Sequence, residues 1–211
     1  MNLEHLKGKF ITFEGIEGSG KSTQSKMLVE YLNNNGIKAV WTREPGGCPE
    51  AEEIRNVLIN GSADKLDGIT ELLLMYAARR VHTEKKIKPL LKEGYVVVSD
   101  RYFDSTFAYQ GFGSGIDLDK IETIKKIVLD NFEPDITIIL DDEVENGLIR
   151  ANKRGDANRF EAKEIEFHNR VRNGFFELVK LYSNRCKMIN INNLSVEEVF
   201  NKLLTIIKKT I

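Results

Sequence analysis

Short apolar runs alternate along this chain with longer stretches in which apolar residues recur every three or four positions. The short runs predict strands at 9–14, 37–42, 95–99, 135–140 and 187–191. The middle ones are almost continuously apolar, as in Val96-Val97-Val98 and Ile136-Thr137-Ile138-Ile139-Leu140, which is typical of strands covered on both faces. The longer stretches predict helices at 22–34, 50–60, 69–92, 117–131, 143–153, 161–183 and 195–209.

Helix-ending and helix-starting signals support these boundaries. Asn33-Asn34-Asn35-Gly36 is expected to end the first helix, and Gly94 to end the long one. Ser195-Val196-Glu197-Glu198 has the form of a capping box that opens the last helix. Because strands and helices alternate throughout, we expect an α/β fold with three αβα layers around a five-stranded parallel sheet, in one domain over 1–211. Ligands of such sheets bind at the carboxyl ends of the strands.

The segment between the first strand and the first helix has a pattern that binds phosphate. Gly15-Ile16-Glu17-Gly18-Ser19-Gly20-Lys21-Ser22 fits G-x-x-x-x-G-K-[ST]. The glycines let the backbone curl so that successive N–H groups point into one concavity, and the following helix adds its N-terminal dipole. We therefore expect these eight residues to bind ATP, in a fold of the P-loop NTPase type. Lys21 is expected to reach the β- and γ-phosphates, and the Ser22 hydroxyl to bind Mg²⁺.

Two charged residues follow the third predicted strand, at the same edge of the sheet. Asp100 stands where a carboxylate helps to hold a Mg²⁺ shell, although an aspartate at such a position also commonly caps a helix. Arg101 is next to it, and a guanidinium suits bidentate phosphate binding; a salt bridge to Asp100 is compatible with that role. We predict Asp100 and Ser22 as the metal ligands and Arg101 as a catalytic residue.

A basic cluster follows the fourth strand and its helix. Arg150, Lys153 and Arg154 share a helix face, and Arg159 lies just beyond Gly155. A solvated charged face is one explanation of this pattern. The break at Gly155 favours instead a mobile lid at about 150–160, which could bring cations to a transferring phosphoryl group.

Composition narrows the class of partner. The 211 residues carry a net charge of −1, so the chain has no overall field for nucleic acid or an acidic membrane. The first ten residues contain charge and no apolar core, and no apolar run is long enough to span a bilayer.

The two cysteines, Cys48 and Cys186, are far apart and are expected to be free thiols in a reducing compartment, the cytoplasm. The three histidines, His5, His82 and His168, lie outside the motifs and are expected to be surface or packing residues.

At this point the chain resembles the thymidylate kinases (dTMP kinases) over nearly its whole length. The resemblance rests on five segments in the order and spacing of that family: the phosphate loop with Phe13-Glu14 before it, Thr42-Arg43-Glu44-Pro45-Gly46-Gly47, Tyr76-Ala77-Ala78-Arg79, Asp100-Arg101-Tyr102 and Ala108-Tyr109-Gln110-Gly111. The phosphate loop alone would identify only a superfamily. The ordered set is far more specific.

The resemblance implies an activity and a set of residue roles. A thymidylate kinase transfers phosphate from ATP to dTMP with Mg²⁺ and forms a homodimer. By resemblance, Arg101 holds the acceptor phosphate with Arg55 nearby, and Glu17 accepts a hydrogen bond from the sugar 3′-OH. Arg79 binds thymine O4, and Thr106 and Gln110 complete the base pocket. The resemblance also implies an arginine-bearing lid that closes over ATP, and since 15–22 contains no arginine, the lid is expected to supply the catalytic one, Arg154 first and then Arg150 or Arg159. Glu44 and Tyr109, which lie in matching segments, are also expected among the substrate-binding residues. One position departs from the family: Met75 stands where a phenylalanine usually stacks on thymine, and a thioether is a less rigid platform.

Three alternatives can be distinguished. Another nucleoside-monophosphate or deoxynucleoside kinase would share the phosphate loop, and here the placement of Arg79 and Tyr109-Gln110-Gly111 favours a thymine monophosphate. A nucleotide switch would need the guanine-reading Asn-Lys-x-Asp, whereas Ala151-Asn152-Lys153-Arg154 has no such aspartate. A non-enzymatic nucleotide-binding protein would not need Lys21, Asp100, Arg101 and the lid arginines together.

Overall fold

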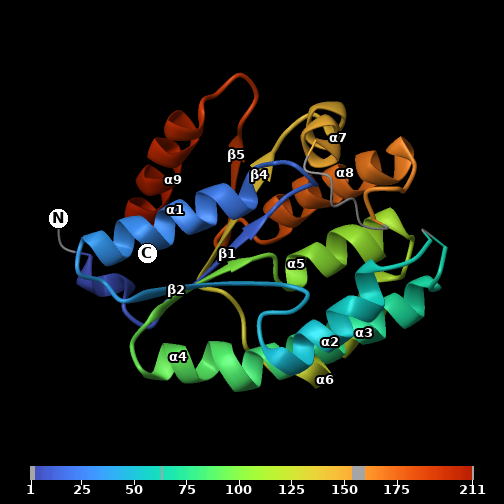
Figure 1. Ribbon diagram of the computed structural model, residues 1–211, viewed down its shortest axis with the longest axis horizontal. Helices are drawn as coiled ribbons and strands as arrows, with labels where there is room; N and C mark the ends of the chain where they lie inside the picture. The colour runs from blue at the N-terminus through green and yellow to red at the C-terminus, as the bar shows by residue number, and fades with distance from the viewer. Residues whose placement is uncertain (1–2, 63, 154–159, 211) are drawn as a thin grey trace.

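Five parallel strands form the central sheet, in the order β2-β3-β1-β4-β5. The computed structural model describes residues 3–62, 64–153 and 160–210 (Figure 1). The strands are β1 (Phe10–Glu14), β2 (Ala39–Arg43), β3 (Val96–Asp100), β4 (Ile136–Asp141) and β5 (Cys186–Asn190). All five predicted strands are confirmed, with ends that differ from the prediction by one or two residues. The predicted three-layer α/β fold is therefore confirmed.

Helices connect the strands and cover both faces of the sheet. They are α1 (Lys21–Asn34), α2 (Pro49–Ile59), α3 (Gly68–His82), α4 (Lys88–Lys92), α5 (Phe103–Thr106), α6 (Leu118–Leu129), α7 (Val144–Asn152), α8 (Ile165–Leu181) and α9 (Val196–Thr210). A 3-10 turn spans Glu4–Leu6, and π-helical segments span Thr83–Ile87 and Phe107–Gly113. No helix in the described part of the chain combines the length and apolar character needed to cross a membrane.

Alternate strand residues belong to two separate apolar cores. Val96 and Val98 pack with α1 and α9 on one side of the sheet, in the core that contains Leu28 and Leu203. Val97 points to the opposite side, where α3, α6 and α8 pack. In Figure 1, α1 and α9 lie together on one side of the sheet and α2, α3, α4 and α6 on the other. The continuous apolar runs of the sequence thus reflect burial on both faces, as parallel strands require.

One helical region was not predicted. After β3 the chain forms α5 and then the π-helical segment Phe107–Gly113, which together build a wall of the site. The glycines here obscured the helical pattern. A Cβ on Gly111 would lie 2.6 Å from Leu118, and one on Gly113 would lie 2.7 Å from Phe167, so close packing rather than a turn explains both.

Other helix boundaries differ in detail from the prediction. The helix expected over 69–92 is α3 and α4 joined through the π-helical segment Thr83–Ile87, and the one expected from 161 begins at Ile165. The capping box is confirmed, because the Ser195 amide donates to Glu198 Oε2 at 2.7 Å and the Glu198 amide donates to Ser195 Oγ at 3.2 Å. Most of the predicted lid at about 150–160 lies outside the described residues.

Candidate active site

A cavity of about 810 Å³ opens at the carboxyl ends of the strands. The phosphate loop divides it into two ends. One end is lined from α3, α5 and the segment 107–113, and the other from α1, α7 and the chain after β5. We call these the acceptor end and the donor end. The acceptor end contains Met75, Arg79, Tyr102, Thr106 and Gln110, and the donor end contains Gln24, Asn146, Arg150, Ile191, Asn192, Asn193 and Leu194.

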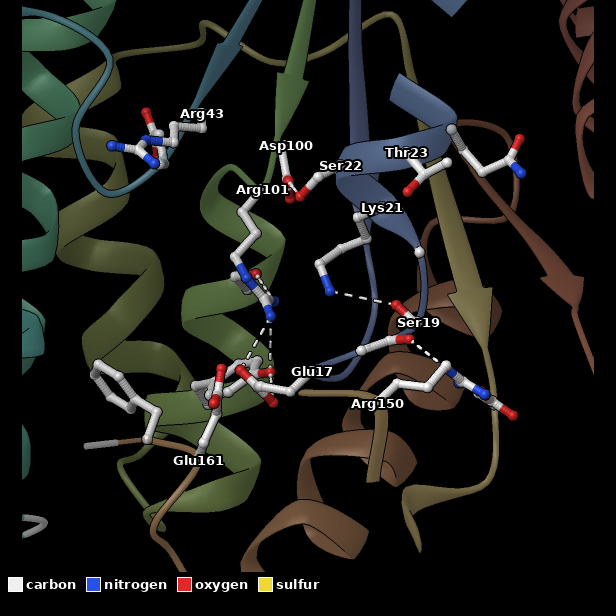
Figure 2. Close-up of a pocket in the computed structure, with 18 of the residues that line it drawn as sticks. Glu17, Ser19, Lys21, Ser22, Thr23, Arg43, Asp100, Arg101, Arg150 and Glu161 are labelled. Atoms are coloured by element: carbon white, nitrogen blue, oxygen red, sulfur yellow. Dashed lines mark hydrogen bonds and ion pairs between the residues drawn. The ribbon is translucent and has the colours of Figure 1, made fainter. Parts of the chain in front are cut away.

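The phosphate loop runs from β1 into α1, as the sequence predicted. Gly20 caps α1 with φ 84°, and Gly15 has φ 135°. A Cβ on Gly15 would lie 2.4 Å from the carbonyl oxygen of Leu140, so the loop requires glycine there for both shape and space. Lys21 bends back to donate to the carbonyl of Ile16 at 2.6 Å and to Ser19 Oγ at 3.3 Å (Figure 2). Burial and the positive charge of Arg101 lower the pKa of Lys21 to about 7, against the opposing effect of nearby carboxylates.

Helix α7 packs directly on this loop. A Cβ on Gly18 would lie 2.0 Å from the carbonyl oxygen of Gly147, and one on Gly147 would lie 2.4 Å from that of Glu17. Because both obstacles are backbone atoms, only a glycine pair allows this approach. Arg150, one turn after Gly147, donates through Nε to the carbonyl of Gly18 at 2.8 Å and forms an ion pair with Asp142.

The predicted metal ligands meet at the end of β3. The Ser22 hydroxyl donates to Asp100 Oδ2, and the two side chains lie together at the cavity wall (Figure 2). Hydroxyl and carboxylate oxygens are hard donors that suit Mg²⁺, which takes few protein ligands when substrate phosphates complete its shell. No cluster of three His, Cys, Asp or Glu side chains suited to a metal occurs within 3–62, 64–153 and 160–210. The two side-chain oxygens of Ser22 and Asp100 therefore fit a Mg²⁺ ion that is also bound to phosphate, rather than a metal site built from protein ligands alone.

Arg101 is fixed by four hydrogen bonds at the centre of the cavity. Its Nη1 donates to the carbonyl of Gly15 and to Ser105 Oγ, each at 2.9 Å, and its Nη2 donates to Glu17 Oε1 and Tyr109 Oη, each at 3.1 Å. Its φ of 71° is unusual for a residue with a Cβ. The possible salt bridge to Asp100 is replaced by one to Glu17 at 3.1 Å. Strained backbone held by surrounding bonds is common at functional sites.

Glu17 points away from the phosphate-binding concavity, toward Arg101 (Figure 2). Its Oε2 accepts a hydrogen bond from Tyr109 Oη at 2.6 Å. Burial alone would raise the pKa of Glu17, but Arg101, His168, Lys21 and Tyr109 outweigh it and lower the pKa to about 2. Glu17 is therefore an anion at neutral pH, with its carboxylate turned to the acceptor end.

The acceptor end is lined by buried polar side chains. Arg79, 2% exposed, donates to Glu44 Oε2 at 2.6 Å, to Thr106 Oγ1 at 3.0 Å and to the carbonyl of Tyr102 at 3.1 Å. Gln110 is 1% exposed, and its Nε2 has no hydrogen-bond partner in the described part of the chain. Met75 lies beside them and packs against the core. A buried, unpaired amide donor that faces a cavity indicates a ligand that accepts a hydrogen bond there.

Arg55 and Arg43 add positive charge where the acceptor end meets the phosphate loop. Arg55 Nη1 donates to the carbonyl of Pro45 at 2.8 Å, and Arg43 forms an ion pair with Glu52 at 3.2 Å. Burial and the charge of Arg43 lower the pKa of Arg55, as expected where cations gather. Both residues line the cavity. Arg43 lies inside a segment that the sequence analysis singled out, although it was not named there as a site residue.

The structure brings nearly all of the predicted site residues to one cavity. Its wall includes the following: Glu17, Gly18, Ser19, Gly20, Lys21, Ser22, Glu44, Arg55, Met75, Arg79, Asp100, Arg101, Thr106, Tyr109, Gln110 and Arg150. Gly15 and Ile16 shape the loop without lining the cavity. Arg154 and Arg159 lie outside the described residues.

Several neighbours of the site carried no sequence signal that we used. Ser105 and Asp142 bind Arg101 and Arg150, and the segment 191–194 forms the wall of the donor end. His82 and His168 are not surface residues: His82 is 0% exposed and His168 is 1% exposed. Each lies beside a site carboxylate. His82 Nδ1 is 3.0 Å from Glu44 Oε1, and His168 Nδ1 is 3.7 Å from Glu17 Oε2. No sequence pattern around either histidine indicated these partners.

Comparison with known proteins agrees with this geometry. The thymidylate kinase family model matches residues 13–203. The thymidylate kinase of Clostridium novyi (strain NT) is 44% identical over 204 residues, which is 96% of this chain and 99% of that protein. The thymidylate kinase of Caulobacter vibrioides is 48% identical over 184 residues, covering 87% and 88% of the two chains. The crystal structure of thymidylate kinase from Ehrlichia chaffeensis superposes with a TM-score of 0.77 at 38% identity, covering 96% of this chain and 99% of that one. This chain belongs to the thymidylate kinase family.

Proposed function

We propose that this enzyme transfers the γ-phosphoryl group of ATP to dTMP and so makes dTDP and ADP, with Mg²⁺. The observation that carries the proposal is that the phosphate loop and a group of buried N–H donors suited to a base line the same cavity. Arg79 and Gln110 offer N–H groups at the acceptor end, and the Gln110 amide is unpaired there. Thymine presents a carbonyl oxygen at C4, which matches such donors, whereas cytosine presents an amino group.

The charges of the site fit transfer between two phosphates. The acceptor is itself a phosphate oxygen, largely ionised near neutrality because the second pKa of a monoester is about 6, so no general base is needed. Lys21 and Arg101 face the space between the two ends of the cavity, one from the phosphate loop and one from the end of β3 (Figure 2). They can hold the reacting phosphates and stabilise the charge that develops. Ser22 and Asp100 would hold Mg²⁺, which neutralises phosphate charge when bound.

The donor end suits the base of ATP. Gln24 anchors to the carbonyl of Val196 through Nε2 at 2.9 Å. Gln24 Oε1 and Asn192 Oδ1 are buried without a hydrogen-bond partner among the described residues. Two acceptor oxygens at this end suit a base with an exocyclic amino group, as adenine has. Arg150 lies at this end and donates to the phosphate loop, and Arg154 and Arg159 are the other candidates for the cation that acts in transfer.

The assembly and the location also belong to the proposal. Val57, Ile69, Leu73 and Ile127 are large apolar residues on α2, α3 and α6 that remain at least 45% exposed. Helix α3 contacts both α2 and α6, so these residues provide an apolar surface for a second copy of the chain. Light scattering should then give the mass of a dimer. Cys48 and Cys186 are free thiols, which fits a cytoplasmic location.

A coupled assay of ADP release tests the activity directly. The purified chain, ATP and Mg²⁺ are combined in turn with dTMP, dUMP, dCMP, dGMP and AMP. We expect dTMP to give the highest kcat/KM and dUMP to come next, because dUMP loses only a methyl contact. Equal turnover of dCMP and dTMP would replace this proposal with a broader pyrimidine-monophosphate kinase.

A further inference from the structure

Four buried polar side chains form a chain of hydrogen bonds behind the acceptor end. Thr42 Oγ1 lies 2.7 Å from His82 Nε2, and His82 Nδ1 lies 3.0 Å from Glu44 Oε1. Glu44 Oε2 accepts from Arg79 Nε at 2.6 Å. None of the four residues is more than 5% exposed. Arg79 is the end of this chain that reaches the base-binding part of the cavity, and the other end is buried in the protein.

Glu44 is fixed from two sides by one helix. Arg79 and His82 lie three residues apart on α3, so they project from the same face of the helix. The Glu44 carboxylate, which follows β2, bridges them through its two oxygens. Each oxygen of Glu44 thus accepts a hydrogen bond from α3, so the carboxylate is a fixed partner of Arg79.

The bonds of His82 define its protonation. A carboxylate oxygen only accepts hydrogen bonds, so His82 Nδ1 must carry a proton to donate to Glu44. In a neutral ring Nε2 then accepts from the Thr42 hydroxyl, whose oxygen is next to it. Glu44 therefore fixes the ring form of His82, Thr42 holds the ring in place through Nε2, and Glu44 in turn holds the plane of the Arg79 guanidinium.

Arg79 needs this support because it can bind the base only while its free N–H groups point into the cavity. Nη1 and Nη2 donate to Thr106 and to the carbonyl of Tyr102, which leaves one N–H on each for a ligand. Burial would lower the pKa of Arg79, but Glu44 opposes this and raises the pKa above its ordinary value. Without the contact to Glu44 at Nε, the guanidinium could rotate, and its free N–H groups would no longer face the base.

We propose that His82 is a positioning residue for base selection, acting through Glu44 on Arg79. The inference rests on the proposed function, because it assigns Arg79 to the acceptor base. It adds a residue that does not touch the nucleotide and yet determines which pyrimidine is accepted. Loss of the His82–Glu44 bond should weaken dTMP binding and reduce the preference for dTMP over dCMP, while ATP binding at the other end of the cavity stays unchanged.

Two replacements of His82 distinguish the roles of its two ring nitrogens. In His82→Asn the amide nitrogen occupies the place of Nδ1 and keeps the bond to Glu44. In His82→Gln the amide nitrogen occupies the place of Nε2, and the bond to Glu44 is lost. We expect His82→Gln to raise KM for dTMP about tenfold and to lower the dTMP-to-dCMP ratio of kcat/KM about fivefold or more. We expect His82→Asn to stay within about threefold of the unchanged enzyme in both quantities, and KM for ATP to stay within about twofold in both variants.

A matched pair of threonines controls for simple loss of stability. Thr42→Val removes the hydroxyl that faces His82. Thr12→Val removes an equally buried hydroxyl on β1, which lies 2.8 Å from Thr137 Oγ1 and is outside this chain of bonds. Both should lower Tm by a similar amount. Only Thr42→Val should raise KM for dTMP.

The results that would overturn this proposal differ from those that would overturn the proposed function. It is overturned if His82→Gln lowers Tm without changing KM for dTMP or the ratio, or if the Asn and Gln variants behave alike. If His82→Gln does not fold, ¹⁵N NMR of the unchanged protein decides: a proton on Nδ1 supports the proposal, and a ring protonated only at Nε2 overturns it. An unchanged enzyme that does not phosphorylate dTMP would instead overturn the proposed function.

Discussion

Arg79 and Arg150 line the same cavity, and they are held in opposite ways. The Arg79 side chain is 2% exposed, and all three of its nitrogens donate to fixed protein acceptors. The Arg150 side chain is 48% exposed and contacts one backbone carbonyl and Asp142. The acceptor end is thus built into the folded core, whereas the arginine of the donor end lies at the surface.

This difference assigns separate tasks to the two ends. A buried guanidinium held at all three nitrogens has little freedom to lose when a ligand binds, so it can discriminate between bases by the direction of its two remaining N–H groups. An exposed arginine with few partners can exchange them for phosphate oxygens, which is what charge stabilisation in a transition state requires. We therefore expect changes at the acceptor end to alter selectivity and changes at the donor end to alter the rate of transfer.

The largest effect should come from the phosphate loop, where the two ends meet. Lys21→Ala removes a charge-assisted contact to the β- and γ-phosphates and should lower kcat by about a thousandfold or more with the fold intact. Steady-state kinetics and circular dichroism would measure both. Lys26→Ala, on the exposed side of the same helix, is the matched control and should leave kcat unchanged. Near-normal turnover in Lys21→Ala would refute the role of the loop.

The next effect should come from the lid arginines. Arg154→Ala should lower kcat about a hundredfold while KM for ATP changes little, because an arginine finger acts mainly in the transition state. Parallel kinetics of Arg150→Ala and Arg159→Ala would identify the dominant cation. A raised KM for ATP with unchanged kcat in Arg154→Ala would make it a ground-state clamp and leave Arg150 or Arg159 as the better candidate.

Nucleotide binding should depend on pH through Lys21. Its pKa of about 7 in the free protein means that it loses its proton as pH rises above 7. The phosphates favour the charged form, so binding must return that proton, and affinity should fall by up to about tenfold per pH unit above 7. Calorimetry at pH 8 in buffers of different ionisation enthalpy should show proton uptake. Proton release, or affinity independent of pH in this range, would contradict the assignment.

A smaller effect should come from Met75. Met75→Phe should tighten dTMP binding several-fold if the side chain lies over the thymine ring, because aromatic stacking contributes about 0.5–1.5 kcal/mol beyond area burial. Overpacking is the competing outcome, since Met75 also packs against the core. Calorimetric affinity for dTMP, read beside Tm, separates the two. No change in either quantity would mean that Met75 does not touch the base.

Most of the fold could be predicted because the patterns that specify it are local. Continuous apolar runs identified β3 and β4, and Ser195 with Glu198 identified the start of α9. The helical segment over 103–113 could not be identified this way, because its glycines are required by Leu118 and Phe167, which approach only in the folded protein. The pattern of neighbouring residues in the sequence does not predict such contacts.

The site could be predicted only where its functional residues lie together in one short segment of the sequence. The phosphate loop and the Asp100-Arg101 pair carry their own signature. His82 carries none, because its partners Thr42 and Glu44 are about forty residues away in the chain and meet it only through the packing of α3 on the end of β2. A single histidine on a helix is compatible with many surroundings, and its role becomes visible only once those partners are in place.

The most direct test of the account is a pair of selectivity measurements on Arg79→Ala and Arg150→Ala. Both would be assayed with dTMP and dCMP at several ATP concentrations, after Tm shows that each is folded. The account predicts that Arg79→Ala lowers the dTMP-to-dCMP ratio of kcat/KM about tenfold or more with KM for ATP nearly unchanged, since removing one buried hydrogen-bond donor costs about 1–3 kcal/mol. Arg150→Ala should leave the ratio unchanged and act on kcat or KM for ATP. If the two variants change selectivity and ATP kinetics alike, the division between a base-reading acceptor end and a phosphoryl-transferring donor end is wrong.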